Sequence, residues 1–143
     1  MPKNKLKFKI VTMEKVTYED EVDQVTVPTE AGEITVLAKH APLVSLLKPG
    51  ELKIKKEGYT ISLFVSTGFL EIRKNSEVYV LADTAERVEE INEEAAREAI
   101  RRAEEIQKQK QYRTDVDFAK LQAIINREAS RLKIAEKHRR IKK

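Results

Sequence analysis

The chain has 143 residues, of which 41% are hydrophobic and 36% are charged, and its formal net charge is +4. This length suits one domain, or a domain with an appendage, and the hydrophobic share is enough for a modest core. The small positive excess does not indicate a dedicated nucleic-acid binder. Because the chain has no cysteine and only two histidines, thiol chemistry is excluded and no metal site is expected.

The first residues alternate lysine with Leu6, Phe8 and Ile10, so they lack the continuous apolar region of a secretory signal. Nor does any later window approach the roughly 20 apolar residues that cross a bilayer, so no transmembrane segment is expected. The alternation over residues 5–11 predicts a strand. Its lysines are expected to face water on an outer strand, where charge discourages edge pairing.

The first half of the chain is rich in turn residues. All four glycines and all four prolines lie before position 69. Between them, apolar residues alternate in short runs, which is typical of a sandwich or barrel. Besides residues 5–11, the predicted strands include residues 25–27, 32–37, 52–54, 59–65, 68–72 and 77–81.

A central stretch organises this half. It begins with the strand opened by Gly32, and Ala41-Pro42 then forces an extended or turned backbone. An apolar run over residues 43–47 follows and is closed by a turn at Pro49-Gly50. A loop that carries His-Ala-Pro is therefore expected between two apolar segments.

The chain changes class between about residues 82 and 91, and two helices are expected beyond that point. Asn92 is the predicted N-cap of the first helix, with acidic residues after it. Thr114 and Asp117 resemble a capping box that opens the second. Each helix carries one apolar stripe at helical spacing. The first stripe is Ala95, Ala96, Ala99, Ile100, Ala103 and Ile106, and the second is Phe118, Leu121, Ile124, Ile125, Ala129, Leu132 and Ala135.

These patterns predict an α+β chain, with a β-sandwich or barrel over residues 1–87 and an antiparallel α-helical hairpin over residues 88–143. Apolar burial stabilises by roughly 25 cal/mol per Å². Two narrow stripes rich in alanine bury little area, so the hairpin is expected to be marginally stable beside a firm β domain.

Several fragments resemble one family when they are taken in order. They are residues 32–33, 36–37, 40–43, 47–50, 68–71, 80–85, 115–118 and 131–135. Together they make essentially the whole chain resemble the epsilon subunit of bacterial F-type ATP synthases. That resemblance implies a flattened N-terminal β-sandwich and a C-terminal helical hairpin without catalytic activity. It also implies a central-stalk rotor subunit that couples proton or sodium transport to ATP synthesis and inhibits ATP hydrolysis through mobile C-terminal helices.

The resemblance further implies partners and a location. The partners are the gamma subunit, the membrane c-ring and the alpha and beta catalytic subunits, and the location is the cytoplasmic face of the bacterial membrane, as a peripheral protein. Gly32 and Glu33 are the expected c-ring contacts. The expected gamma contacts are His40, Pro42, Leu43, Phe69 and Leu70. The alternative interpretation makes Glu33 a solvated turn acid, His40 a loop histidine hydrogen-bonded to the backbone, and the apolar residues part of the core.

Cations crowd the C-terminal end of the chain. The resemblance implies that Lys133, Lys137, Arg139 and Arg140 contact an acidic loop of the catalytic beta subunit during inhibition. The alternative interpretation is that they only favour the carboxyl end of a helix.

Some relatives in the family bind ATP through a motif of the type Ile/Leu-Asp-x-x-Arg-Ala with further arginines. Here the motif begins at Ile91, but Asn92 replaces its acid and Ala95 its arginine. The remaining matches are Glu86, Arg102, Arg127 and Arg131. Because alanine cannot bind phosphate as arginine does, we expect poor affinity for ATP and no required cofactor. The alternative interpretation is a solvated charged face.

Two other functions would require sequence features that differ from those of a stalk subunit. A nucleic-acid-binding module would use the basic helices, but these lack aromatic stacking positions among the arginines, and 24 acidic residues dilute the field. A small enzyme would need a nucleophile beside a base or a phosphate-binding loop, and the sequence shows neither pattern.

Overall fold

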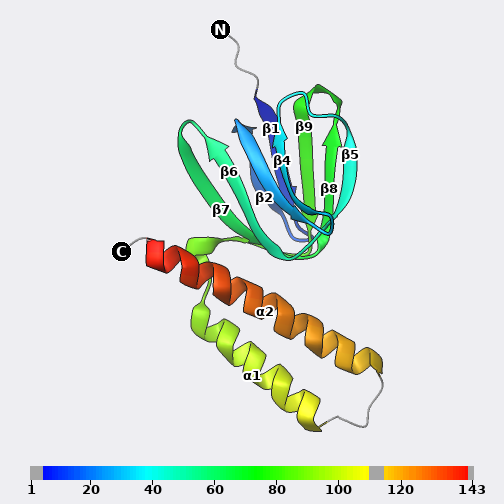
Figure 1. Ribbon diagram of the computed structural model, residues 1–143, viewed down its shortest axis with the longest axis vertical. Coiled ribbons are helices and arrows are strands. Elements are labelled where there is room, and N and C mark those ends of the chain that lie inside the picture. The colour runs from blue at the N-terminus through cyan, green and yellow to red at the C-terminus, as the bar shows by residue number, and fades with distance from the viewer. Residues whose placement is uncertain (1–4, 110–114, 142–143) are drawn as a thin grey trace. The chain divides into compact units, whose positions relative to one another are not determined.

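The computed structural model describes residues 5–109 and 115–141. The chain divides into two compact units, Met1–Arg87 and Val88–Lys143. The first unit consists of strands and the second of helices (Figure 1).

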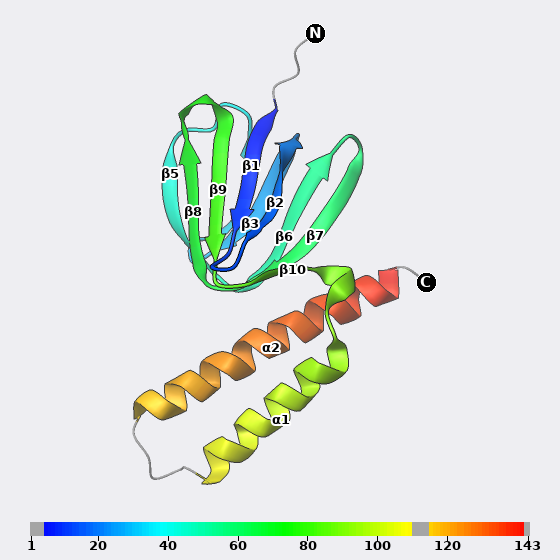
Figure 2. The same ribbon diagram turned by 180° about the vertical axis from the view of Figure 1, so that it is seen from behind.

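The strand unit is a β-sandwich. Its strands are β1 (Leu6–Val11), β2 (Val16–Val22), β3 (Gln24–Thr29), β4 (Gly32–Leu37), β5 (Leu43–Leu47), β6 (Gly50–Lys56), β7 (Tyr59–Val65), β8 (Gly68–Arg73), β9 (Glu77–Ala82) and β10 (Ala85–Arg87), with a 3-10 turn η1 (Lys74–Ser76). They pair in the order β10-β7-β6-β3-β5-β8-β9-β1-β2, and β4 pairs with β3. Only Thr29 and Leu47 are paired between β3 and β5, so the sheet folds there into two layers. Both views show the layers facing each other, which confirms the predicted sandwich (Figures 1 and 2).

The core of the sandwich comes from alternate residues of its strands. Leu6, Phe8 and Ile10 of β1 are buried, as are Leu70 and Ile72 of β8, and all belong to one apolar cluster. Burying a side chain of this size fully is worth roughly 1.5–3 kcal/mol. Because strand residues alternate between two faces, their immediate neighbours point away from the core.

The position predicted for β1 is wrong. The strand lies inside the sheet, parallel to β9 on one side and antiparallel to β2 on the other. Lys9 of β1 faces an acid of β2, since its Nζ lies 3.8 Å from Glu19 Oε2. Lys5, just before β1, has its Nζ 2.8 Å from Oδ1 of Asp23, which follows β2. Strand β2 was not predicted, because residues 19–21 are all acidic and interrupt any apolar alternation. Cross-strand pairing of opposite charges lets β2 form nonetheless.

The helical unit contains η2 (Val88–Glu90), α1 (Glu93–Gln109) and α2 (Asp115–Ile141). The two long helices run antiparallel and side by side in both views (Figures 1 and 2). Asn92 Oδ1 accepts a hydrogen bond from the Ala95 backbone nitrogen at 3.0 Å, which confirms the predicted N-cap. The predicted cap residue Thr114 lies outside the described residues. None of the described helices combines the length and hydropathy that crossing a bilayer requires.

The predicted apolar stripes are confirmed only in part. On α1, Ala96 and Ala103 are buried, whereas Ala95 is exposed. On α2, Phe118 and Ala129 are exposed, and Glu128 is buried in place of Ala129. Both positions continue the helical spacing, because Glu128 lies three residues after Ile125 and Ala129 lies four residues after it, so spacing alone does not select between them. The prediction failed there because it selected residues by apolarity.

Candidate functional site

An apolar row crosses the outer face of one layer of the sandwich. Leu46 pairs with Phe69, Phe69 with Leu81, Leu81 with Val11, and Val11 with Val16, on the consecutive strands β5, β8, β9, β1 and β2. Val11 is half-buried, and the exposed fractions of Leu46, Phe69, Leu81 and Val16 are 54%, 51%, 47% and 47%. Isolated exposed apolar residues are ordinary, but a contiguous set marks a binding surface.

The row faces outward on β5, β8, β9 and β1 because each of these strands sends an adjacent residue into the core. Leu47 is buried beside Leu46, and Leu70 is buried beside Phe69. Val11, Val16 and Leu81 were not among the residues predicted as contacts. Adjacent apolar pairs such as Ile10-Val11 and Leu81-Ala82 were the sequence signal, because neighbouring strand residues point to opposite faces and only one residue of each pair can enter the same core.

Two of the predicted gamma contacts need correction or restriction. Leu70 has an exposed fraction of 0% in the core, so its side chain is not available to a partner. Leu43 is partly exposed at 37%, but it pairs with buried Ile72 and shares the side of β5 that carries Leu47. Phe69 and Pro42 are exposed. The sequence did not distinguish the two faces of an apolar run.

Beside the row lies an open hollow of about 470 Å³. Leu46, Phe69 and Leu81 line it, and Glu30 and Asp83 place carboxylates there. Gly68 also lines it, and its backbone lies so close to β9 that an added Cβ would be 1.9 Å from the Leu81 carbonyl oxygen. The floor of the hollow therefore requires glycine.

The predicted His-Ala-Pro loop is held by hydrogen bonds. The His40 backbone nitrogen donates to the Leu37 carbonyl oxygen at 3.2 Å, and the Lys39 nitrogen donates to Ser76 Oγ at 2.8 Å. The ring atom Nδ1 of His40 lies 2.7 Å from the Ala41 carbonyl oxygen. Since a carbonyl oxygen only accepts, Nδ1 carries the proton of this hydrogen bond.

The turn that carries Gly32 and Glu33 is fixed by Thr29. The buried Thr29 hydroxyl donates to the Gly32 carbonyl oxygen at 2.6 Å and accepts from the Ala31 nitrogen at 3.2 Å. Gly32 has φ of 109°, which a residue with a side chain rarely adopts. Both Gly32 and Glu33 are exposed, so the turn presents a carboxylate on a defined backbone.

The arginines predicted to hold nucleotide already have carboxylate partners. Arg127 Nε donates to Glu128 Oε2 at 3.0 Å, and Arg131 donates to Glu128 Oε1 at 2.5 Å. Arg102 Nε donates to Glu98 Oε1 at 3.2 Å. Of the other predicted positions, Glu86 lies on β10 in the sandwich unit, and Ile91 is buried in the helical unit. Glu128, with an exposed fraction of 4%, was not singled out, although arginines at positions 127 and 131 flank it in sequence.

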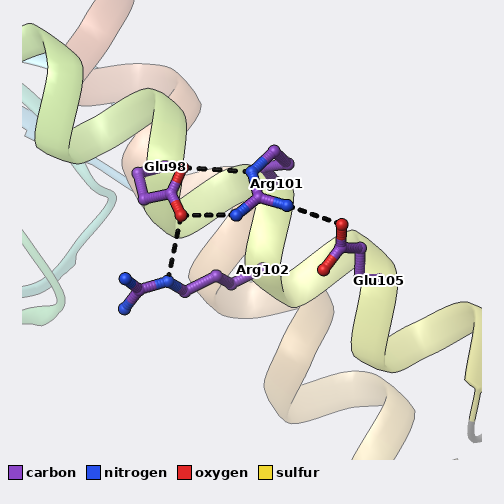
Figure 3. Close-up of polar contacts among 4 residues, drawn as sticks. All are labelled: Glu98, Arg101, Arg102 and Glu105. Atoms are coloured by element: carbon purple, nitrogen blue, oxygen red, sulfur yellow. Dashed lines mark hydrogen bonds and ion pairs between the residues drawn. The ribbon is translucent and has the colours of Figure 1, made fainter.

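Glu98 is the centre of a charge cluster on α1 (Figure 3). Arg101 donates to both of its oxygens, at 3.0 and 2.5 Å, and also donates to Glu105 at 2.6 Å. The hydrogen bonds from Arg101 lower the pKa of Glu98 from 4.5 to about 2, and Arg102 contributes in the same direction. These three- and four-residue spacings stabilise the exposed face of a helix.

The predicted inhibitory cations lie in the last turns of α2. Lys133, Lys137, Arg139 and Arg140 are all exposed. Arg139 differs from Arg140 because its guanidinium lies 3.2 Å from Glu93 Oε1 of α1. One of the expected inhibitory cations is therefore ion-paired inside the hairpin.

Comparisons with known proteins assign the chain to a family. Residues 5–88 match the family described as ATP synthase, Delta/Epsilon chain, beta-sandwich domain. An ATP synthase epsilon chain of Dehalococcoides mccartyi is 46% identical over 136 residues, which cover 95% of this chain and 96% of that relative. An ATP synthase epsilon chain of Desulforamulus reducens is 41% identical over 127 residues, which cover 89% of this chain and 94% of that relative.

The fold agrees with these relatives. A chain from the mitochondrial ATP synthase of Euglena gracilis superimposes with a TM-score of 0.75 at 22% identity, over 90% of this chain and 79% of that chain. At that identity the likeness concerns the fold alone. The sandwich is therefore the β-sandwich domain of a delta or epsilon chain. The relatives that match over most of the chain's length are epsilon chains. The chain belongs to the ATP synthase epsilon chain family. Its function is that of a non-catalytic subunit of the central stalk in the F-type ATP synthase.

Proposed function

We propose that the chain attaches to the gamma subunit through the apolar row and the His40 loop, and that it couples proton or sodium transport to ATP synthesis. The row is the observation that carries this proposal, since an exposed apolar band rimmed by charged residues suits a permanent protein interface. Phe69, the one aromatic residue of the row, supplies an anchor of the kind that dominates binding energy.

The second contact is proposed to be the membrane c-ring, through Gly32 and Glu33. The hydrogen bonds of Thr29 hold the backbone of this turn in one conformation. A charged side chain on such a rigid turn suits a rotor subunit, because a rigid contact transmits torque. With this contact the subunit is a peripheral protein at the cytoplasmic face of the bacterial membrane.

The helical unit is proposed to inhibit ATP hydrolysis. In the inhibitory state, Lys133, Lys137, Arg139 and Arg140 contact acids of the catalytic subunits. With 27 residues, α2 spans about 40 Å as a continuous helix, which is enough to reach along a stalk. ATP is not a required ligand in this proposal, because Asn92 and Ala95 depart from the nucleotide motif. In addition, Arg127 and Arg131 are already hydrogen-bonded to Glu128.

Reconstitution tests the function as a whole. The purified chain is added to a catalytic complex that contains alpha, beta and gamma subunits but lacks epsilon. We expect co-elution with the complex and a decrease in ATP hydrolysis. Deleting residues 133–143 should restore most of the hydrolysis without releasing the chain. Failure to co-elute would exclude the attachment, and unchanged hydrolysis after the deletion would exclude the inhibitory role of the tail.

A further inference from the structure

Four charges of alternating sign lie between the beginning of α1 and the end of α2. Glu93 Oε1 lies 3.2 Å from Arg139 across the hairpin and 3.4 Å from Arg97 on its own helix. Arg97 in turn lies 3.9 Å from Glu136 of α2. The cluster thus joins the helices at the end of the hairpin opposite the interhelical connection.

The ends of the helices reinforce this cluster. Glu93 is in the first turn of α1 and Arg139 in the last turn of α2, so each side chain has the sign that its own helix end favours. Antiparallel packing brings these two ends together, and each residue also pairs with the other. The pair is accessible to solvent, because both side chains line an open hollow of about 240 Å³.

Arg139 differs from Lys133 and Arg140 in this respect. Within the described part of the chain, neither Lys133 nor Arg140 makes an ion pair, and both are exposed. In the closed hairpin, Arg139 is therefore ion-paired with Glu93, whereas Arg140, its neighbour in the same turn, is exposed to solvent. The two arginines give a matched comparison at almost the same position.

We propose that Glu93 and Arg139, supported by Arg97 and Glu136, form an electrostatic latch that favours the closed hairpin and withholds Arg139 from other acids. This proposal rests on the proposed inhibitory function only for its consequence, which is that acids of the catalytic subunits compete with Glu93 for Arg139. The latch itself is a property of the chain alone. Because it is exposed to solvent, ionic strength weakens it.

Opening can be measured on the free full-length chain with a single thiol. The chain has no cysteine, so Ala96→Cys introduces its only thiol at a buried position of α1 near the latch. The alkylation rate relative to the denatured chain reports how often the hairpin opens, even when the open state is rare. The variants are Glu93→Gln, Arg139→Gln and the double variant, and the matched controls are Glu94→Gln and Arg140→Gln. Each control removes the same charge from the same turn.

We expect Glu93→Gln and Arg139→Gln each to increase alkylation by about two- to fivefold, which is the range for exposed ion pairs. The double variant should open no more than the stronger single variant, because both changes remove the same interaction. Added salt should increase opening of the parent chain more than that of the double variant, in which Arg97 and Glu136 still pair across the helices. Equal rates for these variants and their controls, or additive effects in the double variant, would overturn the latch.

The assembled complex separates the latch from the proposed function. Glu93→Gln releases Arg139, so it should deepen the inhibition of ATP hydrolysis, whereas Glu94→Gln should not. If Glu93→Gln increases alkylation of the free chain but leaves hydrolysis unchanged, the latch stands and the inhibitory role of Arg139 is wrong. If alkylation does not change, the latch is wrong whatever the hydrolysis rate.

Discussion

Leu46 of β5 and Phe69 of β8 are paired directly across two strands, and both side chains remain about half exposed, at 54% and 51%. They form the β5–β8 end of the apolar row. Since each has a buried neighbour that fills the core, these two side chains are not required for folding and remain available to a partner.

The double variant Leu46→Ser/Phe69→Ser should bind the gamma subunit about 30-fold more weakly or worse, since truncated interface anchors cost about 2 kcal/mol or more. Its free energy of unfolding should change by less than about 1 kcal/mol, because exposed substitutions have small effects. The control is Leu37→Ser on β4, which is equally exposed but outside the row. Binding of the double variant at the affinity of the parent would show that gamma docks elsewhere.

Charge reversal at Glu33 tests the second contact. Glu33→Lys should weaken attachment to a purified membrane sector by roughly tenfold, because a like charge at an interface repels the partner. Glu57→Lys provides the comparison, since Glu57 lies in the turn between β6 and β7 at the opposite end of the sandwich. Equal retention of both variants by the membrane sector would count against Glu33 as a ring contact.

Gly68→Ala should destabilise the sandwich by about 3 kcal/mol, because the added Cβ would meet backbone atoms of β9 that cannot rotate away. Gly58→Ala separates this clash from backbone strain. Gly58 has φ of 87° but open space around the added atom, so its substitution should cost only about 1 kcal/mol. Urea denaturation measures both values, and equal losses for the two variants would contradict the close approach at Gly68.

The charge cluster on α1 predicts a pH dependence. Because the pKa of Glu98 is about 2 in the folded chain and 4.5 ordinarily, its stabilising effect is complete above pH 4.5 and is lost as the pH falls toward 2. A carboxyl titration followed by NMR should show this low pKa. Arg101→Gln should raise it toward 4.5, whereas Arg97→Gln should leave it unchanged. If Arg101→Gln left the pKa of Glu98 unchanged, the hydrogen bonds between the two residues would not be maintained in solution.

Calorimetry with ATP tests the nucleotide site. We expect weak binding by the parent chain and an increase of about tenfold or more for Asn92→Asp/Ala95→Arg, since a hydrogen bond to a charged group is worth about 1.5–3 kcal/mol. Aspartate caps helices as well as asparagine does, and Ala95 is exposed, so the variant should fold. Tight binding by the parent chain would show that the motif arginine is dispensable.

The sequence by itself determined the elements whose patterns are local. Alternation in segments such as Leu6–Val11 and Tyr59–Val65 identified strands, Asn92 marked the start of α1, and the order of short fragments identified the family. These features depend on neighbouring residues along the chain, so a single sequence is enough to show them.

Tertiary structure decided which face each residue presents and which residues meet. Nothing local distinguishes exposed Phe69 from buried Leu70, or makes Glu128 rather than Ala129 a buried residue of α2. The pairing of Lys9 with the acidic strand β2, and of Lys5 with Asp23 after that strand, depends on strand order. The pairing of Glu93 with Arg139 depends on two helices packing antiparallel. The physical reason is that burial and charge pairing are set by contacts between segments distant in sequence, whereas propensity acts only within a segment.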